Sequence, residues 1–147
     1  ALSSAASDVY KRQPLWELGL DFNHGTGHGV GAMLSVHEGP ARINYGQQNT
    51  LPFQPGIVIS DEPGLYFQGE HGVRMENLVE CVELPTGMLG FAPLTMVPID
   101  REVLDPALME PVDIRRLDAY HALVYDALSP YLHGEDLDYL ENATQAL

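Results

Sequence analysis

The segment HGTGHGVG, residues 24–31, places two histidines and four glycines within eight positions. Glycine loses more backbone freedom on folding than any other residue, so a segment this rich in glycine needs a specific reason. A phosphate-binding loop is disfavoured, because the segment has no lysine and no helical pattern follows it. A structural turn would explain the glycines but not the histidines. A metal site would explain both, because glycines let the backbone and the ligands approach an ion closely.

Three further motifs carry side chains that suit the same kind of site. His37 stands in VHEGP, Glu62 in SDEPG at the end of an apolar run, and Glu76 in VRMENLV. A buried carboxylate is costly unless it is paired or bound to a metal. Imidazole and carboxylate are ligands of divalent ions such as Mn²⁺ and Zn²⁺. Taken singly, each acid could also be an exposed strand residue, and each histidine a hydrogen-bonded core residue.

The composition narrows the classes of partner. The 147 residues include 21 acidic and 7 basic side chains, and the formal net charge of -14 disfavours nucleic acid and anionic membrane surfaces. The hydrophobic fraction of 45% is sufficient for a packed core. No apolar run approaches the roughly 20 residues of a spanning helix, and no charged-then-apolar leader is found. The sequence therefore predicts a soluble, cytoplasmic protein.

Cys81 is the single cysteine, which excludes an internal disulfide and favours a reducing compartment. It lies in an apolar, strand-like run. We therefore expect Cys81 in the core rather than as a nucleophile.

Periodicity and turn signals predict the secondary structure. The expected strands are Val30–Val36, Ile57–Ile59 and Val73–Leu84, and the expected helices are Pro14–Leu20 (ended by Gly19), Asp113–Leu128 and Glu135–Thr144. Alternation along the third strand puts Arg74 and Glu76 on one face, with Leu78 and Glu80. Residues 1–13 show no period, so we expect a non-native or disordered leader there. A natural helix end is the alternative.

Four ordered motifs, HGTGHGVG, VHEGP, DEPGLY and VRMENLV, resemble the C-terminal catalytic half of the Xaa-Pro aminopeptidases (aminopeptidase P). These enzymes are pita-bread metallopeptidases, as are prolidase and methionine aminopeptidase. APLTMVPIDREVLDP and RRLDAYHALVYDALSPYL are similar to the C-terminal extension of the longer aminopeptidases P. The resemblance implies an α+β class with a partial pita-bread fold, a curved antiparallel sheet with flanking helices. It places the C-terminal half of the catalytic domain at 14–84 and a helical extension at 85–147.

The resemblance also implies roles for individual residues. Metal ligands are expected at His28, Glu62 and Glu76, and Glu62 is also expected to relay a proton during the attack of water. His24 and His37 match histidines that line the substrate pocket and hold the scissile carbonyl. Arg74 matches an arginine that pairs with a ligand carboxylate and orients it.

The activity implied is release of the N-terminal residue from peptides with proline in second position, by a hydroxide that bridges two divalent ions. Mn²⁺ is the expected ion, with Zn²⁺ or Co²⁺ as alternatives, and the parent protein is expected to be a homodimer that binds neither nucleic acid nor membranes. Prolidase, which cleaves Xaa-Pro dipeptides, is the alternative enzyme. A pita-bread module that binds peptides without catalysis is the alternative outside the enzymes.

The ligand set implied by the resemblance is incomplete in this chain. The family uses five ligands, and the two that are not matched are aspartates that lie upstream. Asp8 and Asp21 do not have the surrounding motif. We therefore expect a fragment that, by itself, neither holds two ions tightly nor cleaves peptides.

Overall fold

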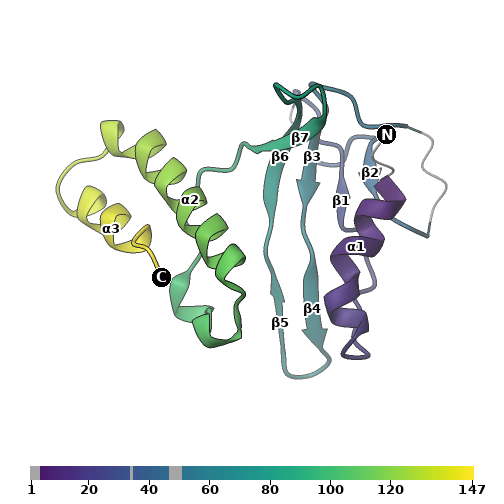
Figure 1. Ribbon diagram of the computed structural model, residues 1–147, viewed down its shortest axis with the longest axis horizontal. Coiled ribbons are helices and arrows are strands. Elements are labelled where there is room, and N and C mark those ends of the chain that lie inside the picture. Colours follow the sequence, from purple (N-terminus) through teal and green to yellow (C-terminus); the bar gives the residue numbers. More distant parts are fainter. Residues whose placement is uncertain (1–3, 34, 47–50) are drawn as a thin grey trace. The chain divides into compact units, whose positions relative to one another are not determined.

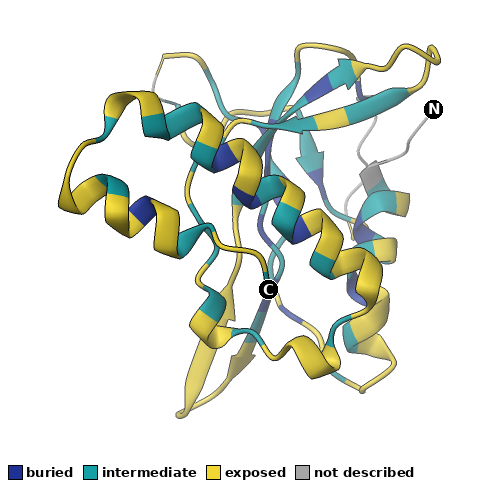
Figure 2. Cartoon of the chain, turned by 60° about the vertical axis from the view of Figure 1, so that its left-hand side comes forward, coloured by how far each residue is buried: buried dark blue, intermediate teal, exposed yellow. Residues whose placement is uncertain are grey.

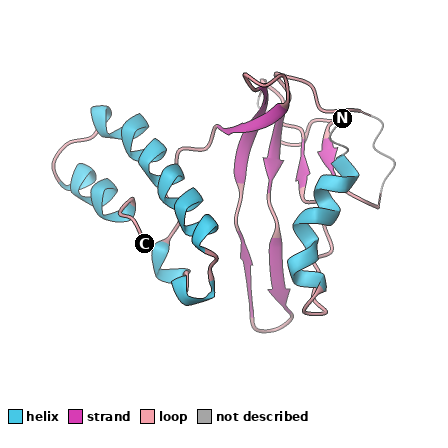
Figure 3. Cartoon of the chain, viewed as in Figure 1, coloured by secondary structure: helices cyan, strands magenta, loops and turns pink. Residues whose placement is uncertain are grey.

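The computed structural model describes residues 4–33, 35–46 and 51–147, and the chain divides into two compact units, Ala1–Thr95 and Met96–Leu147 (Figure 1). The first unit combines a helix with short strands, and the second is helical (Figure 3). In chain order the first unit contains α1 (Ser4–Trp16), β1 (Gly27–His28), β2 (Arg42–Ile43), β3 (Val58–Asp61), β4 (Gly64–Phe67), β5 (His71–Arg74), β6 (Asn77–Glu83) and β7 (Leu89–Pro93).

The strands of the first unit pair antiparallel throughout. β3, β6 and β7 form one sheet in the order β3-β6-β7, while β1 pairs with β2 and β4 pairs with β5. A bridge between Gly29 and Ile59, and a hydrogen bond of 2.7 Å from Glu62 N to the Thr26 carbonyl, join the β1 segment to β3. The predicted boundary between residues 84 and 85 falls in the turn between β6 and β7, and the division into domains 14–84 and 85–147 stays a prediction.

β4 continues the line of β3, and β5 continues the line of β6, with a short interruption in each (Figure 1). The register is the same on both sides of the interruption, since Asp61 faces Asn77 in one ladder and Gly64 faces Arg74 in the other. Pro63 lies in the gap and has no N–H to donate to a ladder. The predicted strand Val73–Leu84 is therefore divided at residues 75–76.

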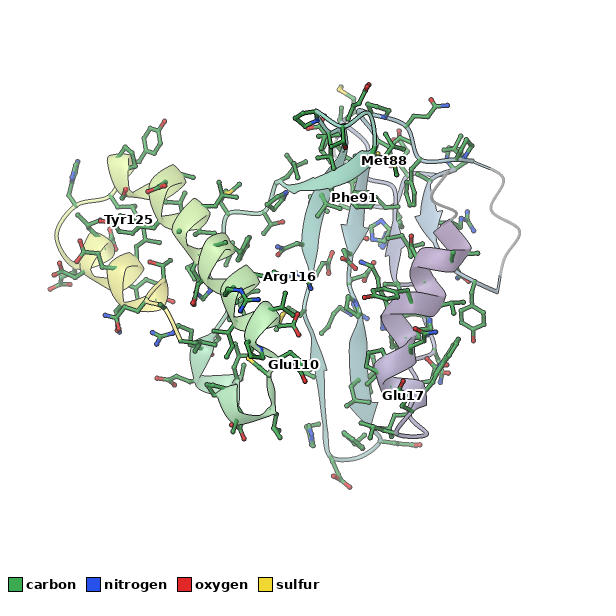
Figure 4. The ribbon with its side chains drawn as sticks, viewed as in Figure 1. Glu17, Met88, Phe91, Glu110, Arg116 and Tyr125 are labelled. Atoms are coloured by element: carbon green, nitrogen blue, oxygen red, sulfur yellow. The ribbon has the colours of Figure 1, made fainter. Side chains whose placement is uncertain are left out.

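β3–β4 and β5–β6 together form a two-stranded ribbon, and the core of the first unit lies on one face of this ribbon. Ile59 and Cys81 are fully buried and pack with Ile43 and Phe53 (Figure 2). The ring of Phe91, on β7, meets the ring of Phe53 edge to face at 5.3 Å (Figure 4). The prediction that Cys81 is a core residue is confirmed. Burial, with the nearby charge of Glu80, raises the pKa of the Cys81 thiol.

Helix α1 differs from the expectation for the start of the chain. Residues 4–13 form most of this helix, so the expectation of a disordered leader is wrong for them. Asp8 and Arg12 are buried, and Lys11 forms an ion pair with Asp61 at the end of β3. The helix ends at Trp16, earlier than predicted, and the chain then turns through the predicted terminator Gly19 at a φ of 72°.

The predicted strand Val30–Val36 is wrong for the described residues 30–33 and 35–36, where the chain turns back on itself. Gly31 N donates to the Ser35 carbonyl at 2.8 Å, and Glu38 N donates to the Gly29 carbonyl at 2.9 Å. A Cβ at Gly31 would lie 2.0 Å from the Glu38 carboxylate, so a larger residue there would displace that exposed side chain. Residue 34 lies outside the described residues.

The second unit contains η1 (Arg101–Val103), η2 (Pro106–Leu108), α2 (Pro111–Leu128), η3 (Ser129–Tyr131) and α3 (Glu135–Ala143). Both predicted helices are confirmed to within two residues. Pro111 opens α2, where its missing N–H has no helical partner to lose. Leu117, His121 and Val124 line the buried stripe of α2, and Leu140 is buried in α3. Asp113 lies in the first turn of α2 rather than at its N-cap, which is Glu110.

Among the described residues, none of the helices has the length and the apolar character that a membrane-crossing helix requires.

Candidate metal centre

Three predicted ligands come together where the β3–β4 and β5–β6 strands are interrupted. His28 lies in β1, Glu62 directly follows β3, and Glu76 directly precedes β6. One ligand atom of each lies within 4.8 Å of the others. Glu62 is 8% exposed, whereas Glu76 is exposed. The residues that the structure describes therefore form a donor set of one imidazole and two carboxylates.

Hydrogen bonds fix which nitrogen of His28 faces the group. Its Nδ1 lies 2.9 Å from the Gly29 carbonyl oxygen, which can only accept, so Nδ1 carries the hydrogen. Nε2 then points a lone pair at Glu62 Oε1, 3.1 Å away. Two lone pairs at this distance repel unless a cation or a proton lies between them. This arrangement is typical of a metal-ligating histidine whose other nitrogen is held by the backbone.

Glu62 and Glu76 are neighbours across the ribbon, because the common register places them opposite each other. Like charges directly opposite each other destabilise a sheet. Ser60 Oγ donates to Glu62 Oε1 at 3.0 Å, and Arg74 Nη1 lies 3.7 Å from Glu62 Oε2. The donor set, its negative charge and the spacing of its atoms therefore fit a divalent cation.

The predicted pocket residues surround the same place. A hollow of about 410 Å³ is lined by His24, His28, His37, Glu62 and Arg74, together with Arg42 and neighbouring loop residues. The ring of His37 lies against the ring of His28, with centroids 4.2 Å apart. The structure therefore brings all predicted site residues except Glu76 to the wall of one hollow, and Glu76 joins them through the ligand group.

Tyr66 is a member of the site that the sequence analysis did not identify. Arg74 Nε donates to the Tyr66 oxygen at 2.9 Å, and this oxygen lies 2.9 Å from His24 Nε2. His24 Nδ1 donates to the Gly25 carbonyl at 2.8 Å, so the Tyr66 hydroxyl donates to Nε2. The hydrogen bond to Tyr66 and the charges of Glu62 and Glu76 raise the pKa of Arg74, against the opposing effect of burial.

The glycines near Tyr66 in the sequence, Gly64 and Gly72, could have indicated that this side chain lies over the hairpin. A Cβ at Gly64 would lie 2.4 Å from the Tyr66 hydroxyl oxygen, and a Cβ at Gly72 would lie 2.5 Å from the ring. Both glycines leave room for the tyrosine to lie over the hairpin. Since side chains alternate along a strand, Tyr66 also lies on the face of Glu62, with Gly64 between them.

Asp8 and Asp21 do not belong to the ligand group. Both carboxylates accept hydrogen bonds from Arg12, Asp8 at 2.8 Å and Asp21 at 2.7 Å.

Residues 2–83 match the sequence model of "Metallopeptidase family M24". The chain belongs to this family. Residues 87–147 match a second model, "C-terminal region of peptidase_M24". The first match contains the whole ligand group of this M24 chain and also the segment 2–13, and the second contains the whole helical unit.

Similar proteins of known description are several times longer than this M24 chain. "Aminopeptidase P2" of Arabidopsis thaliana is 42% identical over 148 residues, which cover 95% of the chain and 21% of the relative. "Probable Xaa-Pro aminopeptidase P" of Penicillium rubens is 42% identical over 155 residues, which cover 99% of the chain and 25% of the relative. The chain thus spans about a fifth to a quarter of these relatives.

Solved structures show the same relationship. The X-prolyl aminopeptidase of Caenorhabditis elegans, described as a cytosolic enzyme with a di-nuclear active site, matches with a TM-score of 0.87 and 36% identity over 99% of this chain and 25% of its own. Prolidase from Pyrococcus furiosus matches with a TM-score of 0.51 and 33% identity over 61% of this chain and 25% of its own. The predicted α+β class and partial pita-bread fold are confirmed.

Proposed function

We propose that the protein containing this chain is a metal-dependent Xaa-Pro aminopeptidase, which releases the N-terminal residue from peptides with proline in second position. The observation that carries the proposal is the group His28, Glu62 and Glu76, with ligand atoms within 4.8 Å, in a chain of the M24 family. The names of the Arabidopsis and Penicillium relatives support the choice of substrate.

Two divalent ions, Mn²⁺ with Zn²⁺ or Co²⁺ as alternatives, are the cofactors we propose. The C. elegans relative has a di-nuclear site, and the donor atoms of His28, Glu62 and Glu76 would be this chain's contribution to such a site. Bound there, the ions would polarise the scissile carbonyl and lower the pKa of a water molecule into the neutral range. We expect further carboxylate ligands from other parts of the protein.

Glu62 is the residue to which we assign proton transfer. It is buried, and Ser60 and Arg74 hold its two oxygens in a fixed orientation. A carboxylate fixed beside the scissile bond can accept a proton from the attacking water and pass it to the departing nitrogen.

The two pocket histidines are assigned to the substrate carbonyl. His37 is exposed at the hollow, where a ring N–H can reach a bound peptide. Both ring nitrogens of His24 are engaged in this structure, Nδ1 with the Gly25 carbonyl and Nε2 with the Tyr66 hydroxyl. His24 would therefore donate to the carbonyl only after exchanging one of these partners for the substrate, and a donor there stabilises the developing negative charge on the carbonyl oxygen. Arg74 would hold Glu62 and, through Tyr66, the imidazole of His24.

Prolidase is the second candidate, because the prolidase from Pyrococcus furiosus is structurally similar to this chain, with a TM-score of 0.51 and 33% identity. The prolidase match covers 61% of the chain, whereas the C. elegans aminopeptidase match covers 99%. Residues 87–147 also match the model of the C-terminal region of M24 peptidases. The helical unit therefore favours the aminopeptidase.

The test is to assay the full-length protein, after metal removal and titration with Mn²⁺, on a Xaa-Pro-Xaa tripeptide, a Xaa-Pro dipeptide and a Xaa-Ala-Xaa control. We expect Mn²⁺-dependent cleavage of the tripeptide only. Preferential cleavage of the dipeptide would identify a prolidase. Peptide binding without cleavage would identify a binding module. Calorimetric titration of the 147-residue chain alone is expected to show no tight binding of two ions.

The proposal extends to the assembly and the location of the protein. We propose a homodimer in the cytoplasm, since the C. elegans relative is described as cytosolic. Light scattering coupled to size exclusion, and cell fractionation, test these two points.

A further inference from the structure

Helix α1 carries a buried ion pair that the metal centre does not use. Asp8 and Arg12 are 0% and 3% exposed at their side chains, and Arg12 Nε donates to Asp8 Oδ1 at 2.8 Å. The guanidinium also lies over the ring of Phe22, 3.8 Å from its centroid. Burial disfavours the charged guanidinium, but the hydrogen bonds and charges of Asp8 and Asp21 outweigh it and raise the pKa of Arg12.

Apart from the hydrogen bond from Arg12 to Asp21, the other hydrogen bonds of the pair go to segments that form the site. Arg12 donates to the carbonyls of Phe22, at 2.7 Å, and of His24. Asp8 accepts from the Thr26 hydroxyl and, at 2.7 Å, from the backbone N–H of Tyr45, which follows β2. Contacts to Phe22, His24 and Thr26 therefore attach the segment 22–26 to a single helix.

We propose that the Asp8–Arg12 pair is a positioning device for the catalytic histidines. It holds the backbone on both sides of Gly25 and thereby fixes the imidazole of His24 in the hollow and the β1 strand that carries His28. The role assigned to His24 rests on the aminopeptidase function proposed above. Among the described residues, the hydrogen bonds of Asp8 and Arg12 go to neither the ligand group nor a histidine ring, and the pair acts through backbone groups and the Thr26 hydroxyl.

Stability alone is a weak reason for such a pair. Buried ion pairs are often replaced by apolar residues without loss of stability, because removing two charges from water is costly. Apolar side chains could attach α1 to the sheet equally well. They could not donate to two carbonyl groups, and a lysine ammonium lacks the planar fork that reaches a carboxylate and two carbonyls at once.

The strand β1, next to the segment that the Asp8–Arg12 pair holds, is tightly packed against β3. A Cβ at Gly27 would lie 1.9 Å from the Ser60 carbonyl oxygen, so β1 lies almost in contact with β3. His28 N donates to Ser60 Oγ at 2.9 Å, and the same hydroxyl holds Glu62. A shift of the segment 22–26 is therefore transmitted to the ligands, and a misplacement of about 1 Å can cost about a hundredfold in rate.

The test compares Arg12→Lys with Val124→Ala in the full-length protein. The lysine keeps the positive charge beside Asp8 and loses the fork. Val124 is buried in the helical unit, so its truncation is a control for a general loss of stability. For each variant, Tm, kcat, KM and the pH profile of kcat/KM on a Xaa-Pro-Xaa peptide are measured. The ¹⁵N spectrum of the metal-free protein, labelled at histidine, reports the His24 tautomer, with His24→Gln for assignment.

We expect Arg12→Lys to lower kcat/KM about ten- to a hundredfold, with a change in the pH profile and in the His24 signals. Val124→Ala is expected to lower Tm about as much as Arg12→Lys does. It should leave kcat/KM, its pH profile and the His24 signals unchanged. Equal effects of the two variants on kcat/KM at equal loss of Tm would overturn the proposal. If the unaltered protein cleaves no Xaa-Pro peptide, the proposed function fails, and the ¹⁵N spectra decide the positioning role: unchanged His24 signals in Arg12→Lys exclude it.

Discussion

Helices α1 and α2 each carry an Asp–Arg ion pair within about one turn, and the two pairs have different surroundings. In α1 the Arg12 and Asp8 side chains are 3% and 0% exposed, and their nitrogen and oxygen lie 2.8 Å apart. In α2 the Arg116 and Asp113 side chains are 75% and 52% exposed, and the distance is 3.2 Å (Figure 4). The same two residue types therefore occur once as a buried anchor and once as a solvated surface pair.

The difference lies in what the arginine reaches beyond its aspartate. Arg12 also donates to Asp21 and to two backbone carbonyls of the segment before β1. Among the described residues, Arg116 donates to Asp113, one turn away on the exposed face of the same helix. Burying a charge is costly unless its hydrogen-bonding groups have partners, so the buried pair requires fixed partners from neighbouring segments. Water can satisfy the exposed pair, which therefore needs no such partners.

The largest effect is expected in the ligand group itself, which neither of the two ion pairs contains. Glu76→Gln removes a negative charge from the ligand group and should lower kcat/KM on a Xaa-Pro-Xaa peptide by more than about a hundredfold, because even residues behind a ligand cost about ten- to a hundredfold. The bound Mn²⁺, measured by elemental analysis, should fall as well. Glu80→Gln, in the strand β6 that Glu76 precedes, is the matched control and should retain both. Full metal occupancy in Glu76→Gln would show that this carboxylate is not a ligand.

Removal of one partner of the buried pair should have the next largest effect. Asp8→Ala leaves Arg12 charged and short of its main acceptor, and should cost about 3–5 kcal/mol of stability. Hydrogen exchange over α1 and the segment 22–28 measures it. The double variant Asp8→Leu with Arg12→Leu should lose less stability than Asp8→Ala, because no charge stays buried. If Asp8→Ala lost as little unfolding free energy as a variant of the exposed Arg116–Asp113 pair, the two ion pairs would not differ in their structural role.

The buried titratable group of α2 predicts a dependence on pH. Burial, and then the charge of Arg101, lower the pKa of His121, whose Nε2 accepts a hydrogen bond from Ile99 N at 3.1 Å. Neutral His121 in the folded protein binds a proton less readily than His121 in the unfolded chain. The stability that neutral His121 contributes is therefore complete above the ordinary histidine pKa of about 6.5, and it is lost as the pH falls below that value. One proton limits the slope to about 1.4 kcal/mol per pH unit.

Thermal unfolding between pH 7 and pH 5 checks this dependence. His121→Gln keeps a hydrogen-bond acceptor and removes the titration, so this variant should show a flatter profile than the unaltered protein. The Asp118 carboxylate contributes in the opposite direction, as its charge favours protonated His121. Identical profiles for the two proteins would rule out His121 as the source.

The smallest effect is expected at the exposed pair. Arg116→Ala should change the free energy of unfolding by less than about 0.5 kcal/mol, because solvent screens the pair and both side chains gain freedom when they separate. Urea unfolding at low and at high salt measures it. A salt-dependent loss of several kcal/mol would mean that Arg116 organises its surroundings as Arg12 does.

Local patterns predicted the elements whose signals lie within a few consecutive residues. The apolar spacing of Leu117 and Val124 located α2, and the β-branched residues 57–59 located β3. Motif resemblance identified His28, Glu62 and Glu76, and the structure brings the three together. The assignment of these residues to a metal stays a proposal, with the geometry in its favour.

Partners far apart in the sequence account for what local patterns did not predict. α1 was missed because buried charges, rather than an apolar stripe, hold it, and several of their hydrogen-bond partners, such as the Phe22 carbonyl and the Thr26 hydroxyl, lie 10 or more residues away. Tyr66 was missed because its partners are His24 and Arg74 on other segments. The interruption before β6 follows from Pro63 on the facing strand, which the sequence of β6 does not contain.

The shared register of the interrupted ribbon limits how such a chain can change length. Ile59 packs in the core, and Glu62 belongs to the ligand group, on strand positions of opposite parity. Deletion or insertion of a single residue between Ile59 and Glu62 would turn the carboxylate toward the core. The core would then contain an unpaired charge, and the ligand group would lose one of its members. The β4–β5 hairpin tip, residues 67–71, contains none of the site residues, so we expect it to accept added residues. Insertions and deletions in natural variants should therefore gather at this tip and avoid 59–62 and 76–81.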